Sequence, residues 1–163
     1  MNIFVLDSNV DLCAQYHVDK HVVKMILETT QLLNNALIKN SPNYIPVYRQ
    51  THKNHPCSIW SSQSFENFEW LNNLGLSLCK EYSFRYGKQH KCQLILEQFD
   101  LQSWKHFLPK IGMLPFAKCM PDIYKVDDPI ESYRNYYRGD KAYIAKWTKR
   151  DVPDWWNKND RKI

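Results

Sequence analysis

Residues 10–39 read VDLCAQYHVDKHVVKMILETTQLLNNALIK, and their periodicity decides the fold class. Apolar side chains recur at spacings of three, four and seven residues, at Leu12, Tyr16, Val23, Ile26, Leu33 and Leu37. This spacing predicts one continuous α-helix with a buried face. Asp7, Ser8 or Asn9 is expected to cap the start of the helix, and the two prolines of NSPNYIP end it.

Two further helices are predicted after this one. The second begins at Pro56, which suits a first helical turn, and ends at Gly87. Its expected buried stripe consists of Trp60, Ser64, Phe68, Leu71, Leu78 and Tyr82. The segment KCQLILEQF predicts a shorter third helix.

A last helix is predicted near the end of the chain. Asp127 or Asp128 before Pro129 is a helix-start signal, and the helix is expected to run to Trp147 with a bend at Gly139. The sequence therefore predicts a mainly α fold. It should be a single domain, residues 1–163, in which about four helices form a bundle with long proline-containing loops and a short N-terminal extended segment.

The composition excludes several classes of protein. Only four glycines are present, and neither a GxGxxG nor a GxxxxGK[ST] pattern occurs, so a Rossmann or P-loop nucleotide site is not expected. Five cysteines without a CxxC pair argue against a disulfide framework and a zinc knuckle. The start MNIFVLDSNVD does not resemble a signal peptide, and no apolar run is long enough for a membrane span. We expect a protein of the cytoplasm, which is the host-cell cytoplasm if a phage encodes it, with no membrane partner.

The first predicted helix carries a second stripe, made of titratable and amide side chains. This stripe contains His17, His21, Lys24, Glu28 and Gln31, and Lys20 borders it. Two interpretations stay open. The stripe is either a solvated face with a Lys24–Glu28 pair, or a reactive site.

A reactive site of this kind needs only an amine and a carboxylate. An amine can attack C1′ of a damaged nucleotide and form a Schiff base, while a carboxylate transfers the protons. Lys20 beside His21 is our candidate for the amine, because neighbouring positive charge and burial disfavour an ammonium ion. Glu28 is the candidate carboxylate. His52 and His55 of THKNHPC precede the second helix and are expected to close over the site.

The same histidines leave a metal site as an alternative. His17 and His21 have the i, i+4 spacing of zinc-binding helices, but Val18 stands where HExxH has glutamate. Together with His52 and His55 they would make a metal-dependent hydrolase. The leading hypothesis requires no metal and no other cofactor.

The C-terminal stretch YRNYYRGDKAYIAKWTKR combines basic and aromatic residues and has one acidic residue, Asp140. Basic side chains neutralise phosphates, and aromatic rings stack on exposed bases. The net charge of +5 also favours an anionic partner. The candidate nucleic-acid-binding residues are Arg134, Tyr137, Arg138, Lys141, Lys146, Trp147, Lys149 and Arg150. Alternatively, the tyrosines are core residues, or the segment binds an acidic protein.

The order of these segments resembles the pyrimidine-dimer DNA glycosylase/AP-lyase family of phage endonuclease V. The resemblance rests on LCAQYH, the histidine-bearing loop, CKEYSFRYGK and the terminal YRNYYRGDKAYIAKW. The chain is also similar to small uncharacterised proteins of tailed phages. Membership implies an all-α monomer that bends duplex DNA and flips a base.

In the endonuclease V family the nucleophile is the N-terminal α-amine exposed by methionine removal, and one glutamate assists it. This sequence departs from that pattern in two places. Asn2 is an unfavourable context for methionine removal, and Glu28 lies further along the helix than the family's glutamate. Lys20 is therefore proposed in place of the terminal amine.

The leading hypothesis is a DNA-acting enzyme of the base-excision type that acts on damaged or modified bases. The alternatives are the metal-dependent hydrolase and a non-enzymatic phage module that binds nucleic acid or a host protein.

Overall fold

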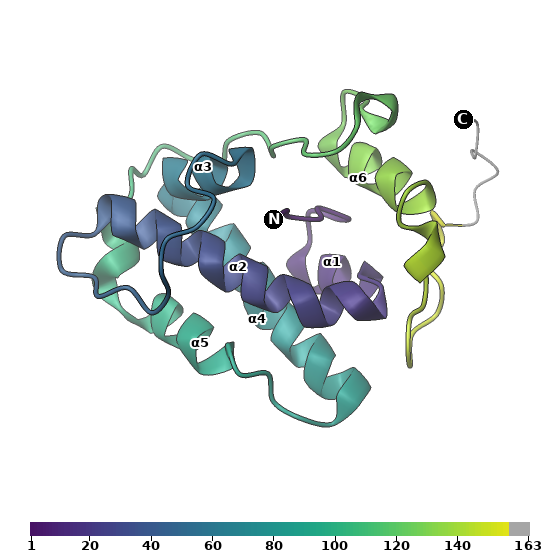
Figure 1. Cartoon of the computed structure of the whole chain (residues 1–163), viewed down its shortest axis with the longest axis horizontal. Helices are drawn as coiled ribbons and strands as arrows, with labels where there is room; N and C mark the ends of the chain where they lie inside the picture. The colour runs from purple at the N-terminus through teal and green to yellow at the C-terminus, as the bar shows by residue number, and fades with distance from the viewer. Residues whose placement is uncertain (157–163) are drawn as a thin grey trace.

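The computed structural model describes residues 1–156, and within this range the chain is helical and contains no β-strand (Figure 1). The six α-helices are α1 Val10–Tyr16, α2 Asp19–Asn40, α3 Pro56–Gln63, α4 Phe65–Tyr86, α5 Gln93–Leu101 and α6 Pro129–Arg138. The three short 3-10 helices are η1 Ser103–Phe107, η2 Asp122–Tyr124 and η3 Ala142–Ile144. The predicted mainly α fold is confirmed, although the helices outnumber the four expected.

The first predicted helix is interrupted, and the prediction of one continuous helix was wrong. His17 and Val18 have extended backbone, with ψ of 133° and 155°, between α1 and α2. Groups distant in sequence take the hydrogen bonds that a continuous helix would use. The Asp19 N–H donates to the Lys146 carbonyl at 2.8 Å, and Arg85 donates to the His17 carbonyl at 2.8 Å.

The second predicted helix is also divided, at Ser64. This residue has ψ of 155° and ends α3, and its side chain caps α4 by accepting from the Asn67 N–H at 3.0 Å. The Asn67 side chain in turn donates to the Trp60 carbonyl at 2.9 Å. The two helices therefore meet at a capped corner.

The last helix ends at Arg138 and does not continue to Trp147 as predicted. Gly139 lies so close to the Tyr124 ring that a Cβ at this position would collide with it. The Tyr124 hydroxyl donates to Asp140 at 2.7 Å, which holds the turn that follows. The chain beyond this turn returns to the junction of α1 and α2.

Several predicted helix ends are confirmed. Asn9 caps α1, and Pro56 stands in the first turn of α3. Gly87 ends α4 in the left-handed conformation, with φ of 67°. Asp128 caps α6 directly before Pro129. Short-range capping chemistry was therefore visible in the sequence.

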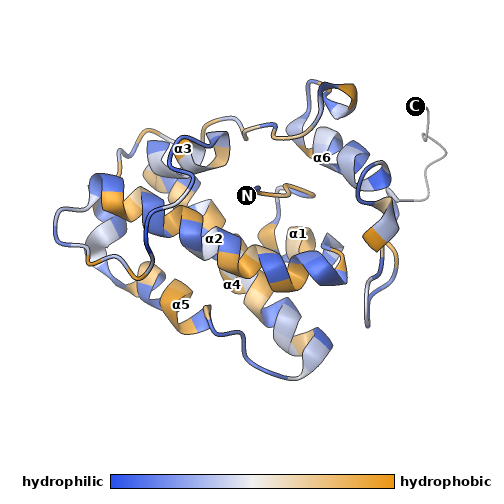
Figure 2. Ribbon diagram, in the orientation of Figure 1, coloured by the Kyte–Doolittle hydropathy of each residue, from blue (hydrophilic) through white to orange (hydrophobic). Residues whose placement is uncertain are grey.

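The core lies where α2 packs against α3 and α4, and α1 packs against α4. Apolar residues recur along α2, α4 and α5 in Figure 2. Fully buried side chains of α2 and α4 include Ile26, Leu33, Leu37, Phe68, Leu71 and Leu78. Leu12 and Val23 of the predicted stripe are instead 40% and 42% exposed, because the break between α1 and α2 changes the register of the two faces.

The N-terminal segment runs into the middle of the molecule. Figure 1 shows the N-terminus at the centre of the view, with α2, α3 and α6 around it. Ile3, Phe4, Val5 and Leu6 are buried. No helix among residues 1–156 is both long and apolar enough to cross a membrane.

Candidate active site

The first residues of the chain are fixed by the side chain of Asn2. Its amide nitrogen donates to the Cys119 carbonyl at 2.8 Å, and its oxygen accepts from the Ile3 N–H at 2.8 Å. The same oxygen lies 3.2 Å from the Tyr133 hydroxyl of α6 and 3.6 Å from the Cys57 thiol of α3. These contacts hold the start of the chain between two helices and the loop that contains Cys119.

The charges of the terminal amine and of Glu28 both act on His55. Burial lowers the pKa of His55, the positive charges of the terminal amine and His52 lower it further, and the negative charge of Glu28 opposes them. Glu28 is only 14% exposed at its side chain, and Lys24, which is 70% exposed, pairs with it at 3.7 Å. An amine and a carboxylate thus influence one partly buried imidazole in opposite directions.

The other members of the predicted catalytic set lie in different environments. Lys20 is exposed in the first turn of α2, and His52 is exposed in the loop before α3 with φ of 52°. His17 and His21 are buried, at 1% and 6% exposure. The predicted continuous stripe of titratable groups does not form, because the helix that would carry it is broken at His17.

The two buried histidines belong to an aromatic cluster. His17 Nδ1 lies 2.7 Å from the Cys13 carbonyl, so this nitrogen carries a proton and donates it. His21 Nδ1 lies 2.7 Å from the Tyr137 hydroxyl, and the His21 ring stacks on Phe4 with a 4.3 Å centroid separation. The cluster connects α2 to α6 and to the N-terminal segment.

Burial should make the fold sensitive to mild acid through these two histidines. It lowers the pKa of His17 from 6.5 to about 4 and that of His21 from 6.5 to about 3. Below 6.5 the unfolded chain binds protons that the folded chain does not, so the free energy of unfolding falls as the pH falls toward 4. At about pH 5 each histidine should account for about 2 kcal/mol of this loss.

Denaturant unfolding near pH 7 and about pH 5 measures the effect. A His17→Gln/His21→Gln variant keeps polar side chains that do not titrate, and it should lose less stability between the two pH values than the wild type. His52→Gln is the matched control, because His52 is exposed. An equal loss in the wild type and the double variant would contradict the assignment.

Three of the predicted nucleic-acid-binding residues are buried. Tyr137 is fully buried, Arg138 is 6% exposed and Trp147 is 8% exposed. Arg138 donates to the Trp155 carbonyl at 2.9 Å and to Glu131 at 2.6 Å. These contacts occupy the side chains within the fold, and their role in binding DNA stays a prediction.

Two more arginines of that set are paired with acidic residues. Arg134 donates to the Leu6 carbonyl at 2.9 Å and lies 3.3 Å from Asp7. Arg150 donates to both carboxylate oxygens of Glu81, at 2.9 Å and 3.0 Å. Both pairs connect the C-terminal segment to earlier parts of the chain.

Three lysines are the members of the set with the most accessible charge. Lys146 and Lys149 are exposed. Lys141 is half-buried, and its ammonium group lies 5.1 Å from the centre of the Tyr136 ring. These three side chains remain candidates for contacts with phosphate groups.

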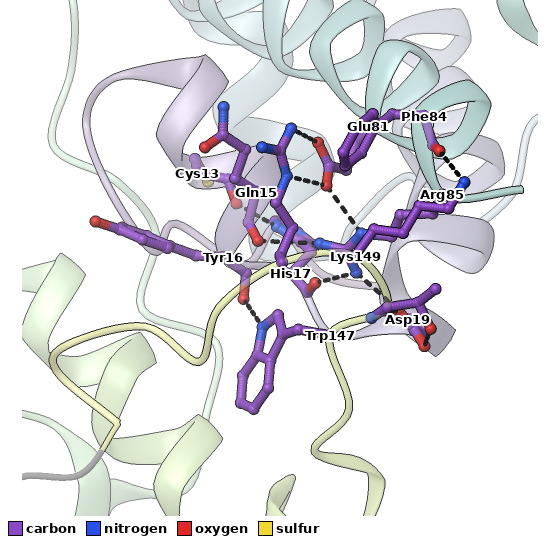
Figure 3. Close-up of polar contacts among 12 residues, drawn as sticks. Cys13, Gln15, Tyr16, His17, Asp19, Glu81, Phe84, Arg85, Trp147 and Lys149 are labelled. Atoms are coloured by element: carbon purple, nitrogen blue, oxygen red, sulfur yellow. Dashed lines mark hydrogen bonds and ion pairs between the residues drawn. The ribbon is translucent and has the colours of Figure 1, made fainter.

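A buried ionic network, which the sequence did not reveal, fixes the junction of α1 and α2 (Figure 3). Arg85 of α4 donates to Glu81 at 2.8 Å, to Asp19 at 2.9 Å and to the backbone carbonyls of Gln15 and His17 at 3.0 Å and 2.8 Å. Burial alone would raise the pKa of Asp19, but hydrogen bonds from Thr148 and Arg85 lower it below its usual value.

The sequence also gave no signal for the contacts around Asn2. Cys57 and Cys119 are 62 positions apart, and their sulfur atoms lie 3.4 Å from each other. Tyr133 is the first residue of the basic and aromatic C-terminal stretch. Its hydroxyl lies 3.2 Å from the Cys119 N–H and 3.2 Å from Asn2 Oδ1. Only the tertiary structure brings these residues together.

Comparison with known proteins gives one match. A family model described as pyrimidine dimer DNA glycosylase matches residues 1–94 of the 163-residue chain. The matched range includes Asn2, Glu28 and His55, together with α1, α2, α3 and α4. No curated protein and no solved structure matches the chain.

Proposed function

Because this chain belongs to the pyrimidine dimer DNA glycosylase family, we propose that it removes a damaged or modified base from DNA and then cleaves the abasic site. The observation that carries the proposal is the fixed position of the N-terminus. The Asn2 side chain fixes the residue next to the terminal amine, and the charges of that amine and of Glu28 both act on His55. An amine and a carboxylate are the combination that this chemistry requires.

The proposed reaction begins with attack of the terminal amine on C1′ of the target nucleotide. The bond from C1′ to the base breaks as the new C1′–N bond forms, and the departing base takes up a proton. Loss of the amine protons and opening of the sugar ring give the imine, with a proton delivered to the ring oxygen. Removal of a C2′ proton then expels the 3′ phosphate and cleaves the strand.

Glu28 is the proposed group for the proton transfers. Its side chain is mostly buried on α2, and its charge acts on His55. His17 and His21 are proposed to support the site from the core through Phe4 and Tyr137. His52 is proposed to stand at the rim, where it is exposed.

The nucleophile is the α-amine of Met1, or that of Asn2 if Met1 is removed. Lys20 is the second candidate, since its amine is exposed at the start of α2. The terminal amine is the preferred candidate, because its charge acts on His55 and the next residue is fixed by the Asn2 side chain. DNA is the proposed partner, with Lys141, Lys146 and Lys149 in contact with its phosphates.

Borohydride trapping on DNA that contains an abasic site tests the reaction. Reduction should convert the imine into a stable covalent adduct between the protein and DNA, and peptide mapping should locate the adduct on the first residue. Lys20→Ala should form the adduct at the wild-type rate, whereas acetylation of the α-amine should abolish it.

Two results would contradict this assignment. An adduct that maps to Lys20 and disappears in Lys20→Ala would transfer the nucleophile to that side chain. If no adduct forms with abasic DNA and none forms with DNA that carries pyrimidine dimers, the protein does not catalyse the proposed lyase reaction.

The metal-dependent alternative with four histidines has little support in the described residues. His17 and His21 are buried, and their Nδ1 atoms lie 2.7 Å from Cys13 and Tyr137 partners. Among residues 1–156, the potential metal ligands that converge are instead His55, Cys57 and Cys119.

A further inference from the structure

Three side chains that can bind a metal converge beside Asn2. One ligand atom from each of His55, Cys57 and Cys119 lies within 4.8 Å of the other two. His55 caps α3, Cys57 is in the first turn of the same helix, and Cys119 lies in the loop before η2. Cys57 is fully buried, while Cys119 and His55 are partly buried.

We propose that these three residues form a zinc site. Thiolate and imidazole are the ligands that zinc prefers, and the set of two cysteines and one histidine supplies three of its four positions. In a tetrahedral zinc site with the usual Zn–S distance, the sulfur atoms of two bound thiolates lie about 3.8 Å from each other. The sulfur atoms of Cys57 and Cys119 are 3.4 Å apart before any adjustment, so only small movements are required.

Asn2 lies at the fourth side of the cluster. Its side-chain oxygen is 3.6 Å from the Cys57 sulfur and also accepts from the Ile3 N–H at 2.8 Å, so it would join the metal through a water molecule. A metal ion here would connect α3, the loop that contains Cys119 and the first residues of the chain. It would hold the terminal residue in place without taking part in the formation of the imine.

The arrangement of His55 requires one change when metal binds. Its Nδ1 accepts the Cys57 N–H at 3.1 Å. Binding through Nδ1 replaces this hydrogen bond, and binding through Nε2 requires a proton on Nδ1, which removes it as well. The loss of one hydrogen bond is small compared with the affinity of structural zinc sites.

A disulfide between the two cysteines is the competing explanation of their proximity. It would require the sulfur atoms to approach from 3.4 Å to about 2.05 Å, and it would not account for the convergence of His55 with the two cysteines. A metal ion uses all three side chains, and for this reason we favour it.

Zinc binding to the reduced, metal-free full-length chain tests the proposal. Titration calorimetry should give one Zn²⁺ per chain. Replacement of zinc by Co²⁺ should give the thiolate charge-transfer absorption and the intense visible bands of a tetrahedral site. Loss of an outer-shell partner of a metal commonly costs about 10–100-fold in affinity, so loss of a ligand in Cys57→Ser or Cys119→Ser should cost at least about 100-fold.

Cys92→Ser is the matched control, because Cys92 is buried but lies outside the cluster, and it should bind zinc as the wild type does. Circular dichroism confirms that each variant folds, and Cys119→Ser changes only a partly buried loop residue.

Absence of stoichiometric metal from the reduced wild type would overturn the proposal. Zinc affinity unchanged in Cys119→Ser would overturn it too, as would a reduced chain that binds no metal but forms a Cys57–Cys119 disulfide with hydrogen peroxide. Because zinc binding is measured without DNA, its failure is distinct from failure of the proposed reaction, which borohydride trapping reports.

Discussion

Replacing Arg85 by methionine is expected to lower the free energy of unfolding by about 3–5 kcal/mol, the usual cost of removing one partner from a buried ion pair. The Arg85 side chain is fully buried, and its partners Glu81 and Asp19 are only 4% and 14% exposed. Methionine fills a similar volume but leaves both carboxylates without this partner. It also leaves the carbonyls of Gln15 and His17 without the donor that replaces their helical bonds.

Guanidinium unfolding followed by circular dichroism measures the effect. Natural domains have a total stability of about 5–15 kcal/mol, so the loss in Arg85→Met should be a large fraction of the total. Lys24→Met is the matched control, since it breaks the exposed Lys24–Glu28 pair, and it should cost about 0.5 kcal/mol or less.

A second variant separates the charge of Arg85 from its shape. Arg85→Lys keeps the positive charge but cannot donate to Glu81, Asp19 and two carbonyls at once. It should therefore recover only part of the lost stability. If Arg85→Met costs no more than Lys24→Met, the network does not hold the junction of α1 and α2 in the way proposed here.

The same junction explains why the sequence predicted the helices better than their interruptions. Caps at Asn9, Gly87 and Asp128 depend on residues within one turn, so the sequence contains them. The break at His17 depends on Arg85 and Lys146, which are 68 and 127 positions away from their backbone partners His17 and Asp19. Helical periodicity continues across such a break, because it reports only local spacing.

The C-terminal segment shows a related limit of sequence reasoning. Basic and aromatic residues at helical spacing suit both a DNA-binding surface and a packed face. Tyr137, Arg138 and Trp147 are buried because this segment covers the start of the chain, where Trp147 donates to the Tyr16 carbonyl at 2.8 Å. The charge pattern of a sequence cannot distinguish a basic residue that forms an ion pair inside the protein from one that is free to bind a phosphate group.

The candidate site was predictable only in part. Glu28 and His55 were selected from the sequence, and the charges of Glu28 and of the terminal amine both act on His55. The side chain of Asn2, which fixes the residue next to that amine, was not selected, because its partners Cys119 and Tyr133 lie 117 and 131 positions away. The resemblance to the endonuclease V family pointed to the terminal amine, and the hydrogen bonds of Asn2 supply the physical reason to prefer it to Lys20.

Replacing Glu28 by glutamine is expected to slow adduct formation and strand cleavage by about 10²–10⁴-fold, the usual contribution of general acid–base catalysis. Glutamine has the shape of glutamate but cannot transfer a proton at neutral pH. The free energy of unfolding should change little, because the ion pair of Glu28 with Lys24 is exposed on the lysine side. Binding of abasic DNA should also be retained, since the change does not remove a positive charge.

Single-turnover trapping and cleavage rates, measured with the protein in excess over DNA, provide the test. Lys24→Ala removes the same ion pair while it preserves the carboxylate, so it should react within a few-fold of the wild type. Glu97→Gln is a second control, because it makes the same chemical change on a different helix. Glu97 lies on α5, which packs against α4 and η1. Wild-type rates in Glu28→Gln would exclude Glu28 as the proton-transfer group. A slow rate shared by Lys24→Ala and Glu28→Gln would mean that the pair positions α2 and that Glu28 transfers no proton. The proposed chemistry therefore depends on a difference between two variants that break the same contact.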